Sequence, residues 1–215
     1  MKKLTTFAII ACTVLLSRNA VAQKINVNAG LNISSITTNL GFSDPKLKPG
    51  FHIGASVDYA VSDLFSIDGG LLLSSMGYRI NNDFDYGFGP EHVEGNISPY
   101  YLTIPILLKA NFELGNIQAF AGVGPYAAFG LFGNVDRKYT PANGNSEDLS
   151  GDIEWGENGM NRFDFGLQAK VGLEFDKINV ALFYGQGLVD VISVEDEYFL
   201  NTVFGFTVGY TLFEK

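Results

Sequence analysis

Histidine is the side chain best suited to acid–base catalysis near neutral pH, and this chain has two, His52 and His92. His52 stands four residues before Ser56, and His92 lies in a Pro-Glu-His stretch. Serine, histidine and carboxylate residues do not occur in the order and spacing of a catalytic motif. A glycine-rich phosphate loop, a zinc motif and a nucleotide-binding fingerprint are also lacking. We therefore predict that the protein is not an enzyme and holds no cofactor. The catalytic alternative is a lipid-modifying enzyme that uses His52.

Carboxylates gather in two segments, and carboxylate oxygens are the ligands that Ca²⁺ and Mg²⁺ prefer. Segment 133–161 contains Asp136, Glu147, Asp148, Asp152, Glu154 and Glu157, and segment 190–197 contains Asp190, Glu195, Asp196 and Glu197. Their spacing matches no metal-binding loop, so we predict no metal site. Trp155, the only tryptophan, lies in the first segment, and tryptophan is suited to partner contact. The predicted outer contacts are therefore Trp155, Glu147, Asp148, Asp152 and Glu154. Packing on the rim of the fold is the alternative for Trp155.

Strict alternation of apolar and polar side chains defines the elements that must position these residues. Residues 163–175, Phe-Asp-Phe-Gly-Leu-Gln-Ala-Lys-Val-Gly-Leu-Glu-Phe, alternate without a break. Successive side chains of a strand face opposite sides of a sheet, so this strand has one apolar and one polar face. It is longer than the roughly 5–6 residues of a soluble strand. A tilted strand that crosses a bilayer needs about 9–11 residues. The pattern therefore predicts a membrane-spanning strand.

The same alternation recurs at 24–34, 50–61, 65–79, 100–113, 117–132, 178–188 and 199–213. Short connections at 62–64, 114–116 and 176–177 alternate with long ones at 35–49, 80–99, 133–161 and 189–198, and aromatic residues gather near the strand ends. These features predict an all-β fold, an eight-stranded antiparallel up-and-down transmembrane β-barrel with short periplasmic turns and long extracellular loops. The alternative is a soluble lipocalin-like barrel, whose apolar face would line a ligand cavity.

The N-terminus predicts export. Residues 1–22 combine Lys2 and Lys3, an apolar run and Ala20-Val21-Ala22, which is typical of a cleaved signal peptide. A lipoprotein signal at Cys12 is the alternative. The barrel domain would then be 23–215, without cysteine and thus without disulfides or thiolate metal sites. The whole chain has 14 basic and 23 acidic residues, so nucleic acid is not an expected partner. The predicted location is the bacterial outer membrane.

Inward-facing charges would fill the barrel. An eight-stranded barrel is only wide enough for side chains, and an isolated buried charge is costly. We therefore predict a charge network in the lumen, formed by Asp58, Asp68, Lys109, Arg162, Asp164, Lys170 and Glu174. A pathway for small solutes or protons is the alternative. Pro105 and Pro125 interrupt two strands, and we expect a bulge or locally widened pairing there.

Several stretches resemble PorT-like outer-membrane β-barrel proteins. Residues 101–109, Tyr-Leu-Thr-Ile-Pro-Ile-Leu-Leu-Lys, resemble that family's Tyr-Leu-x-Ile-Pro-Leu-Leu-Leu-Lys stretch, and 121–126, Ala-Gly-Val-Gly-Pro-Tyr, its Gly-x-Gly-Pro-Tyr strand. Residues 163–166 and 184–188 match later strands. The resemblance covers essentially the whole chain after the signal. It implies an eight-stranded outer-membrane barrel and little about activity, because fold does not fix function. The C-terminus, Leu212-Phe213-Glu214-Lys215, departs from the usual aromatic end.

These observations favour a non-catalytic outer-membrane protein that serves as a membrane-anchored scaffold or a partner-binding surface protein. Its expected partners are outer-membrane lipid, lipopolysaccharide and an envelope protein. The main alternative is a component of an envelope or secretion machine of the PorT-like kind. A narrow pore is a further alternative.

Overall fold

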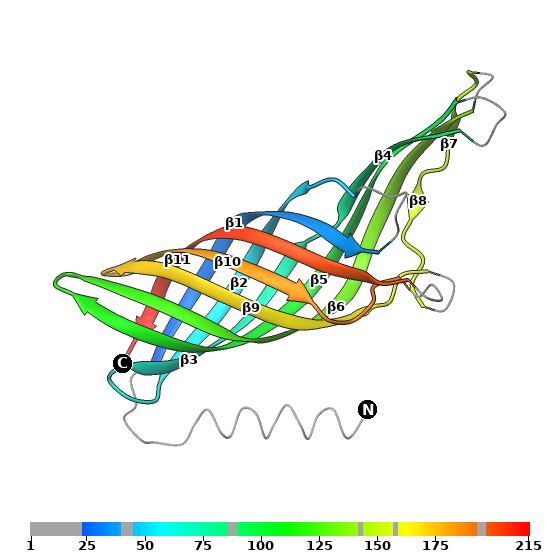
Figure 1. Cartoon of the computed structure of the whole chain (residues 1–215). Coiled ribbons are helices and arrows are strands. Elements are labelled where there is room, and N and C mark those ends of the chain that lie inside the picture. Colours follow the sequence, from blue (N-terminus) through cyan, green and yellow to red (C-terminus); the bar gives the residue numbers. More distant parts are fainter. Residues whose placement is uncertain (1–22, 40–44, 86–89, 142–143, 157–158, 193–196) are drawn as a thin grey trace.

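Eight antiparallel strands close into a barrel in the computed structural model, which describes residues 23–39, 45–85, 90–141, 144–156, 159–192 and 197–215 (Figure 1). The barrel strands are β1 (Gln23–Thr38), β2 (Lys48–Ala60), β3 (Phe65–Ser75), β5 (Pro90–Leu114), β6 (Ile117–Thr140), β9 (Phe163–Phe175), β10 (Ile178–Gly187) and β11 (Phe199–Glu214). β11 pairs with β1, with Leu31 opposite Phe206, and this pairing closes the ring. The predicted fold class is confirmed. The predicted signal peptide, residues 1–22, lies outside the described residues.

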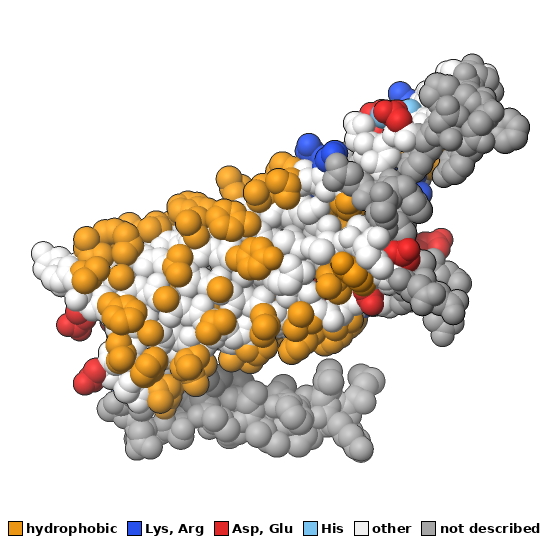
Figure 2. All heavy atoms as spheres, viewed as in Figure 1, with side chains coloured by type: hydrophobic (Ala, Val, Ile, Leu, Met, Phe, Trp, Pro, Cys, Tyr) orange, Lys and Arg blue, Asp and Glu red, His pale blue; other side chains and the backbone are white. Residues whose placement is uncertain are grey.

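The outer surface of the barrel is apolar and its interior is polar. Side chains such as Leu31, Ile53 and Leu167 are exposed, whereas Asn28, Ser56 and Thr207 are buried inside. Figure 2 shows hydrophobic side chains spread along the visible side of the barrel. A solvent-exposed apolar surface of this extent marks an interaction surface, and a closed barrel has no unpaired strand edge to expose to lipid. Among the described residues, no helix is long and apolar enough to cross a membrane.

The chain continues as paired strands beyond the barrel, where we predicted loops at 80–99 and 133–161. β4 (Tyr78–Asp85) pairs with the first part of β5, and β5 and β6 continue as a hairpin to Pro90 and Thr140. The short strands β7 (Glu147–Asp148) and β8 (Gly151–Asp152) pair with β6. Together these segments form an arm that projects from the loop end of the barrel (Figure 1). The loop prediction was wrong for most of 80–99 and for 133–140.

Alternation persists in the arm, but its polarity is inverted. Within the barrel, β5 turns Leu102, Ile104 and Ile106 outward, whereas above the barrel it turns Ile97 inward and Asn96 outward. Gly77 lies at the transition between β3 and β4 with φ +146°, a conformation that favours glycine, and a Cβ there would lie 2.1 Å from the Ile97 carbonyl oxygen. The inversion explains the incorrect loop prediction, because we expected apolar residues on the outer face of every strand.

The two strand prolines are accommodated by interruptions of the ladders around them. Pairing of β3 with β5 lapses between Gly69–Ile106 and Leu72–Thr103, next to Pro105. Pairing of β5 with β6 lapses between Pro105–Tyr126 and Leu108–Val123. A proline cannot donate a ladder hydrogen bond, so the widened pairing lies where the donor is missing.

The lipid-facing assignment predicts a stability cost that depends on depth. Leu182 lies in the middle of β10, and Leu212 lies beside the turn between β9 and β10; their side chains are 44% and 60% exposed. We expect Leu182→Arg to lower the free energy of unfolding by about 2–4 kcal/mol and Leu212→Arg by about 0–1 kcal/mol. Denaturant titrations of both variants in phospholipid vesicles measure this difference. Equal costs at the two positions would contradict the membrane placement.

Candidate functional site

Three lysines inside the barrel form ion pairs between strands. Lys109 of β5 pairs with Asp58 of β2, and both side chains are more than nine-tenths buried. Lys170 of β9 lies 3.1 Å from Asp68 of β3. Lys24 of β1 contacts Glu174 of β9 and lies 3.3 Å from Glu214. The Lys170–Asp68 and Lys24–Glu174 pairs join strands that are three apart around the ring, so they cross the interior. Lys109 and Asp58 lie on the two neighbours of β3, and Lys24 and Glu214 lie on adjacent strands. Buried ions of this kind are tolerated only when they are paired.

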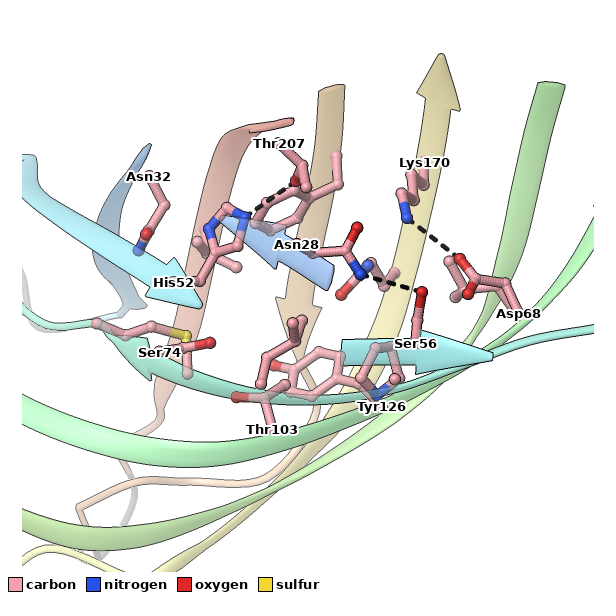
Figure 3. Close-up of a pocket in the computed structure, with 18 residues that line it drawn as sticks. Asn28, Asn32, His52, Ser56, Asp68, Ser74, Thr103, Tyr126, Lys170 and Thr207 are labelled. Atoms are coloured by element: carbon pink, nitrogen blue, oxygen red, sulfur yellow. Dashed lines mark hydrogen bonds and ion pairs between the residues drawn. The ribbon is translucent and has the colours of Figure 1, made fainter. Parts of the chain in front are cut away.

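A small cavity with both polar and apolar walls lies next to these pairs (Figure 3). Its volume is about 40 Å³, and its walls include His52, Asn28, Ser56 and Asp68. His52 Nε2 lies 3.0 Å from Thr207 Oγ1, and Asn28 donates to Ser56 over the same distance. Four buried wall atoms have no partner: Asn32 Oδ1, His52 Nδ1, Asp68 Oδ1 and Thr103 Oγ1. A cavity of this size and polarity suits a few water molecules.

Asp164, which we predicted in the charge network, is held by neutral donors. Its carboxylate is fully buried and accepts hydrogen bonds from the Tyr126 hydroxyl and from Asn201 Nδ2, both at 3.0 Å. Among the described residues, no lysine or arginine pairs with it. The Asp164 group therefore forms a separate polar cluster, on the outer side of the water-sized cavity.

Two apolar clusters fill the barrel mouth above the cavity. The lower cluster consists of Met76, Tyr101, Tyr126, Ala128 and Val203. The upper cluster consists of Ile36, Tyr78, Ile97, Ile153, Met160, Val191 and Phe199. Trp155 packs against both clusters, and its ring meets that of Tyr101 edge-on at 6.0 Å. A Cβ at Gly130 would lie 2.3 Å from the Trp155 ring, so this glycine makes room for it. Trp155 therefore packs onto the rim, which was the alternative to the predicted partner contact.

Arg162 lies outside the lumen, contrary to our prediction. Its guanidinium donates to the Gly130 carbonyl at 2.9 Å and lies 5.2 Å from the Trp155 ring centroid. Arg162 directly precedes β9, which begins at Phe163. The alternation of inward and outward side chains along the strand therefore does not determine where the Arg162 side chain points. Its packing on Trp155 helps to hold the tryptophan in the mouth, since a guanidinium is attracted to an aromatic face.

The four predicted carboxylate contacts remain exposed on the arm and its return segment: Glu147, Asp148, Asp152 and Glu154. Glu147 and Asp148 form β7, and Asp152 lies in β8. The hydroxyl and backbone N–H of Ser150 donate to Asp148, and these bonds hold the pKa of Asp148 below its usual value. Among the residues that the structure describes, no group of three or more His, Cys, Asp or Glu side chains is placed to hold a metal ion.

Lys24 and Glu214 form a charged pair that the predicted lumen network did not include. The alternation at 24–34 turns Lys24 inward, but the sequence does not show which strand closes the ring or in what register. The β1–β11 register places Lys24 directly opposite Glu214. The interior thus holds ion pairs, a water-sized cavity and an apolar plug. This arrangement can stabilise a closed barrel.

Comparison with known proteins agrees with this geometry. A family model described as "Outer membrane protein beta-barrel domain" matches residues 21–193. No curated protein matches the chain. The fold is similar to the outer membrane protein OprG from Pseudomonas aeruginosa (TM-score 0.48, 12% identity, covering 89% of this chain and 96% of that one). It is also similar to Neisserial surface protein A (TM-score 0.41, 11% identity, covering 87% of this chain and 97% of that one). A third similar structure is that of Ail of Yersinia pestis (TM-score 0.37, 14% identity, covering 89% of this chain and 99% of that one).

The ion pairs predict a large cost when one partner is removed. We expect Lys109→Met to lower the free energy of unfolding by about 3–5 kcal/mol, because Asp58 is left buried without its partner. The double variant Lys109→Met/Asp58→Leu should recover most of that loss, since no charge remains unpaired. Denaturant titration of the three proteins measures the coupling between the two sites. Additive losses in the double variant would show that the two side chains are not coupled.

Proposed function

Since this chain belongs to the outer membrane β-barrel protein family, we propose that it is a non-catalytic surface protein that holds its arm outside the membrane for contact with a partner. The observation that carries the proposal is the combination of a filled barrel with an ordered arm. The barrel anchors the protein, and the accessible polar chemistry lies on the arm. We also propose that residues 1–22 are an export signal removed before insertion.

The filled interior supports a scaffold rather than a pore. Ion pairs cross the turn-side half of the lumen, and two apolar clusters with Trp155 occupy its mouth. The cavity between them is about 40 Å³, which is far below the volume of a hydrated solute pathway. Passage of a solute would require several buried pairs to separate at once.

The buried position of His52 supports the absence of catalysis. Its side chain is 3% exposed and bonds to Thr207 in the lumen, so a lipid substrate outside the barrel has no path to it. His92, on the arm, is bonded to Asp83 at 2.7 Å. Among the described residues, the hydrogen-bond partners of the two histidines are Thr207 and Asp83 rather than the serine hydroxyl that nucleophilic catalysis requires.

The arm is suited to partner contact because it is ordered by the barrel strands themselves. β5 and β6 run for 25 and 24 residues, from the turns to the arm, with a register shift in their pairing between Tyr100 and Tyr101. Exposed carboxylates lie along its return segment, at Glu147, Asp148, Asp152 and Glu154. A preorganised surface loses little conformational entropy on binding.

We propose a PorT-like role, as a component of an envelope or secretion machine, as the second candidate. It rests on the two stretches that resemble PorT-like proteins. These stretches lie on adjacent strands, with Pro105 of β5 paired with Tyr126 of β6. The arm would then contact another component of the machine.

A conductance measurement tests the filled barrel. We expect the purified protein in a planar bilayer to give no stepwise ion current, because the lumen lacks a continuous aqueous path. Trp155→Ala should stay closed as well, since the Tyr101 cluster and the lysine pairs remain. A steady current that changes with Lys109→Met or Lys170→Met would overturn the scaffold proposal in favour of a pore.

A shortened arm tests the role of the arm itself. Arg79 pairs across the hairpin with Asn96, and Val135 pairs with Gly151, so residues 80–95 and 136–150 can each be replaced by an Asn-Gly turn. We expect this variant to insert into the membrane. In gel electrophoresis, its unboiled sample should migrate faster than its boiled sample, as that of a folded barrel does. It should fail to restore envelope function to cells that lack the gene. Full restoration would show that the arm is dispensable.

A further inference from the structure

Three basic residues come together where the arm leaves the barrel. Lys46 and Arg79 exchange two backbone hydrogen bonds, at 2.9 and 3.1 Å, so their side chains lie on neighbouring strands directly opposite each other. Lys48 follows two residues later, and both Arg79 and the Asp136 carboxylate lie within its electrostatic range. Like charges placed directly opposite on a sheet repel each other. An anion bound between Lys46 and Arg79 would reduce this repulsion.

The basic residues inside the barrel provide an internal contrast. Lys24, Lys109 and Lys170 each pair with a carboxylate. Over the described ranges, neither Lys48 nor Arg79 forms an ion pair with a carboxylate, and Arg79 is exposed. Lys46 makes a further contact of its own, so Arg79 and Lys48 are the principal cations of the cluster.

Arg79 and Lys46 also line a groove on the outer face of the arm, with a volume of about 730 Å³. Across the sheet, Arg79 is followed by Asn96 and then by Asp136, which accepts a hydrogen bond from Asn134 at 2.8 Å. The other charged side chains that line the groove are Glu94, Arg137, Lys138, Glu147 and Asp148. The groove thus offers cations for an anion, together with amide and carboxylate groups that suit sugar hydroxyls.

The height of the cluster matches that of lipid headgroups. Phe51, Tyr100 and Phe132 form an aromatic group on the outer surface, with ring centroids 6.1 and 4.8 Å apart, and such groups mark the membrane interface. Asn96, the partner of Arg79, lies four residues beyond Tyr100. That is about 13 Å along a strand, or roughly 10 Å of height at a tilt of about 40°. Figure 2 shows basic side chains immediately beyond the hydrophobic part of the barrel.

We propose that Arg79, with Lys46 and Lys48, binds the phosphate groups of lipopolysaccharide headgroups in the outer leaflet. The inference rests on the membrane placement within the proposed function. Leu47, between the two lysines, is 61% exposed and would contact the apolar edge of the same lipid.

Native mass spectrometry of the full protein in non-ionic detergent tests the site, with bis-phosphorylated lipid A as the probe. We expect Arg79→Gln/Lys48→Gln to lower the apparent affinity about ten-fold or more, since each basic residue near a membrane surface contributes substantially to anion attraction. The matched control, Lys177→Gln/Lys215→Gln, removes two positive charges from the opposite rim and should bind as the native protein does. Fully dephosphorylated lipid A should bind all proteins equally weakly.

Each further outcome is decisive. Equal losses in the Arg79 and Lys177 variants would overturn the proposal. So would binding of dephosphorylated lipid A to the native protein as tightly as that of bis-phosphorylated lipid A. Binding of inorganic phosphate that displaces the lipid would assign the site to free phosphate instead. In gel electrophoresis, faster migration of the unboiled sample shows that a variant is folded. If the double variant does not fold, the single variant Arg79→Gln is used in its place. The shortened arm keeps Arg79 but loses most of the groove, so Arg79→Gln/Lys48→Gln, whose arm is intact, is the variant that separates lipid binding from arm function.

Discussion

Hydrocarbon offers no hydrogen-bond partner to a peptide group, so each N–H and C=O of a strand in the bilayer must bond to a neighbouring strand. The chain meets this requirement by pairing β11 with β1 over almost their full lengths. Closure then fixes the other properties of the molecule. It separates an apolar outer surface from a narrow polar interior, and it forces the charged side chains at inward positions to find partners across that interior.

Inside the barrel, the charged side chains are paired and little space is left unfilled. The lysine pairs lie toward the turns, the Asp164 cluster lies toward the mouth, and the cavity between them has room for only a few waters. Several buried acceptors face that cavity without a protein partner, and water is the partner that its size admits. Such an interior stabilises one closed state, because opening a path would leave several buried charges unpaired at once.

The sequence predicts the barrel well because side-chain alternation depends only on neighbouring residues. The range 163–175 agrees at both ends with β9, and all eight barrel strands have the predicted order. It predicts the arm poorly, because Ile97 and Asn96 alternate with a polarity opposite to that of the membrane strands. The contacts of Arg162 and Lys24 escaped prediction for a different reason: the packing of Trp155 and the register of ring closure depend on contacts between distant residues.

The inversion of polarity at the barrel mouth determines where the protein can act. Below it, apolar side chains face lipid; above it, Tyr78, Ile97 and Val135 turn inward and form a core like that of a soluble protein. This core packs with Ile153 and Met160, so the return segment from β6 to β9 is fixed against the arm. Because β5 and β6 are continuous from the barrel into the arm, the direction of the arm is set by these strands and by the register shift at Tyr100/Tyr101. A ligand bound at the base of the arm therefore contacts a rigid surface at a fixed height above the membrane, which is the condition that recognition of a lipid headgroup requires.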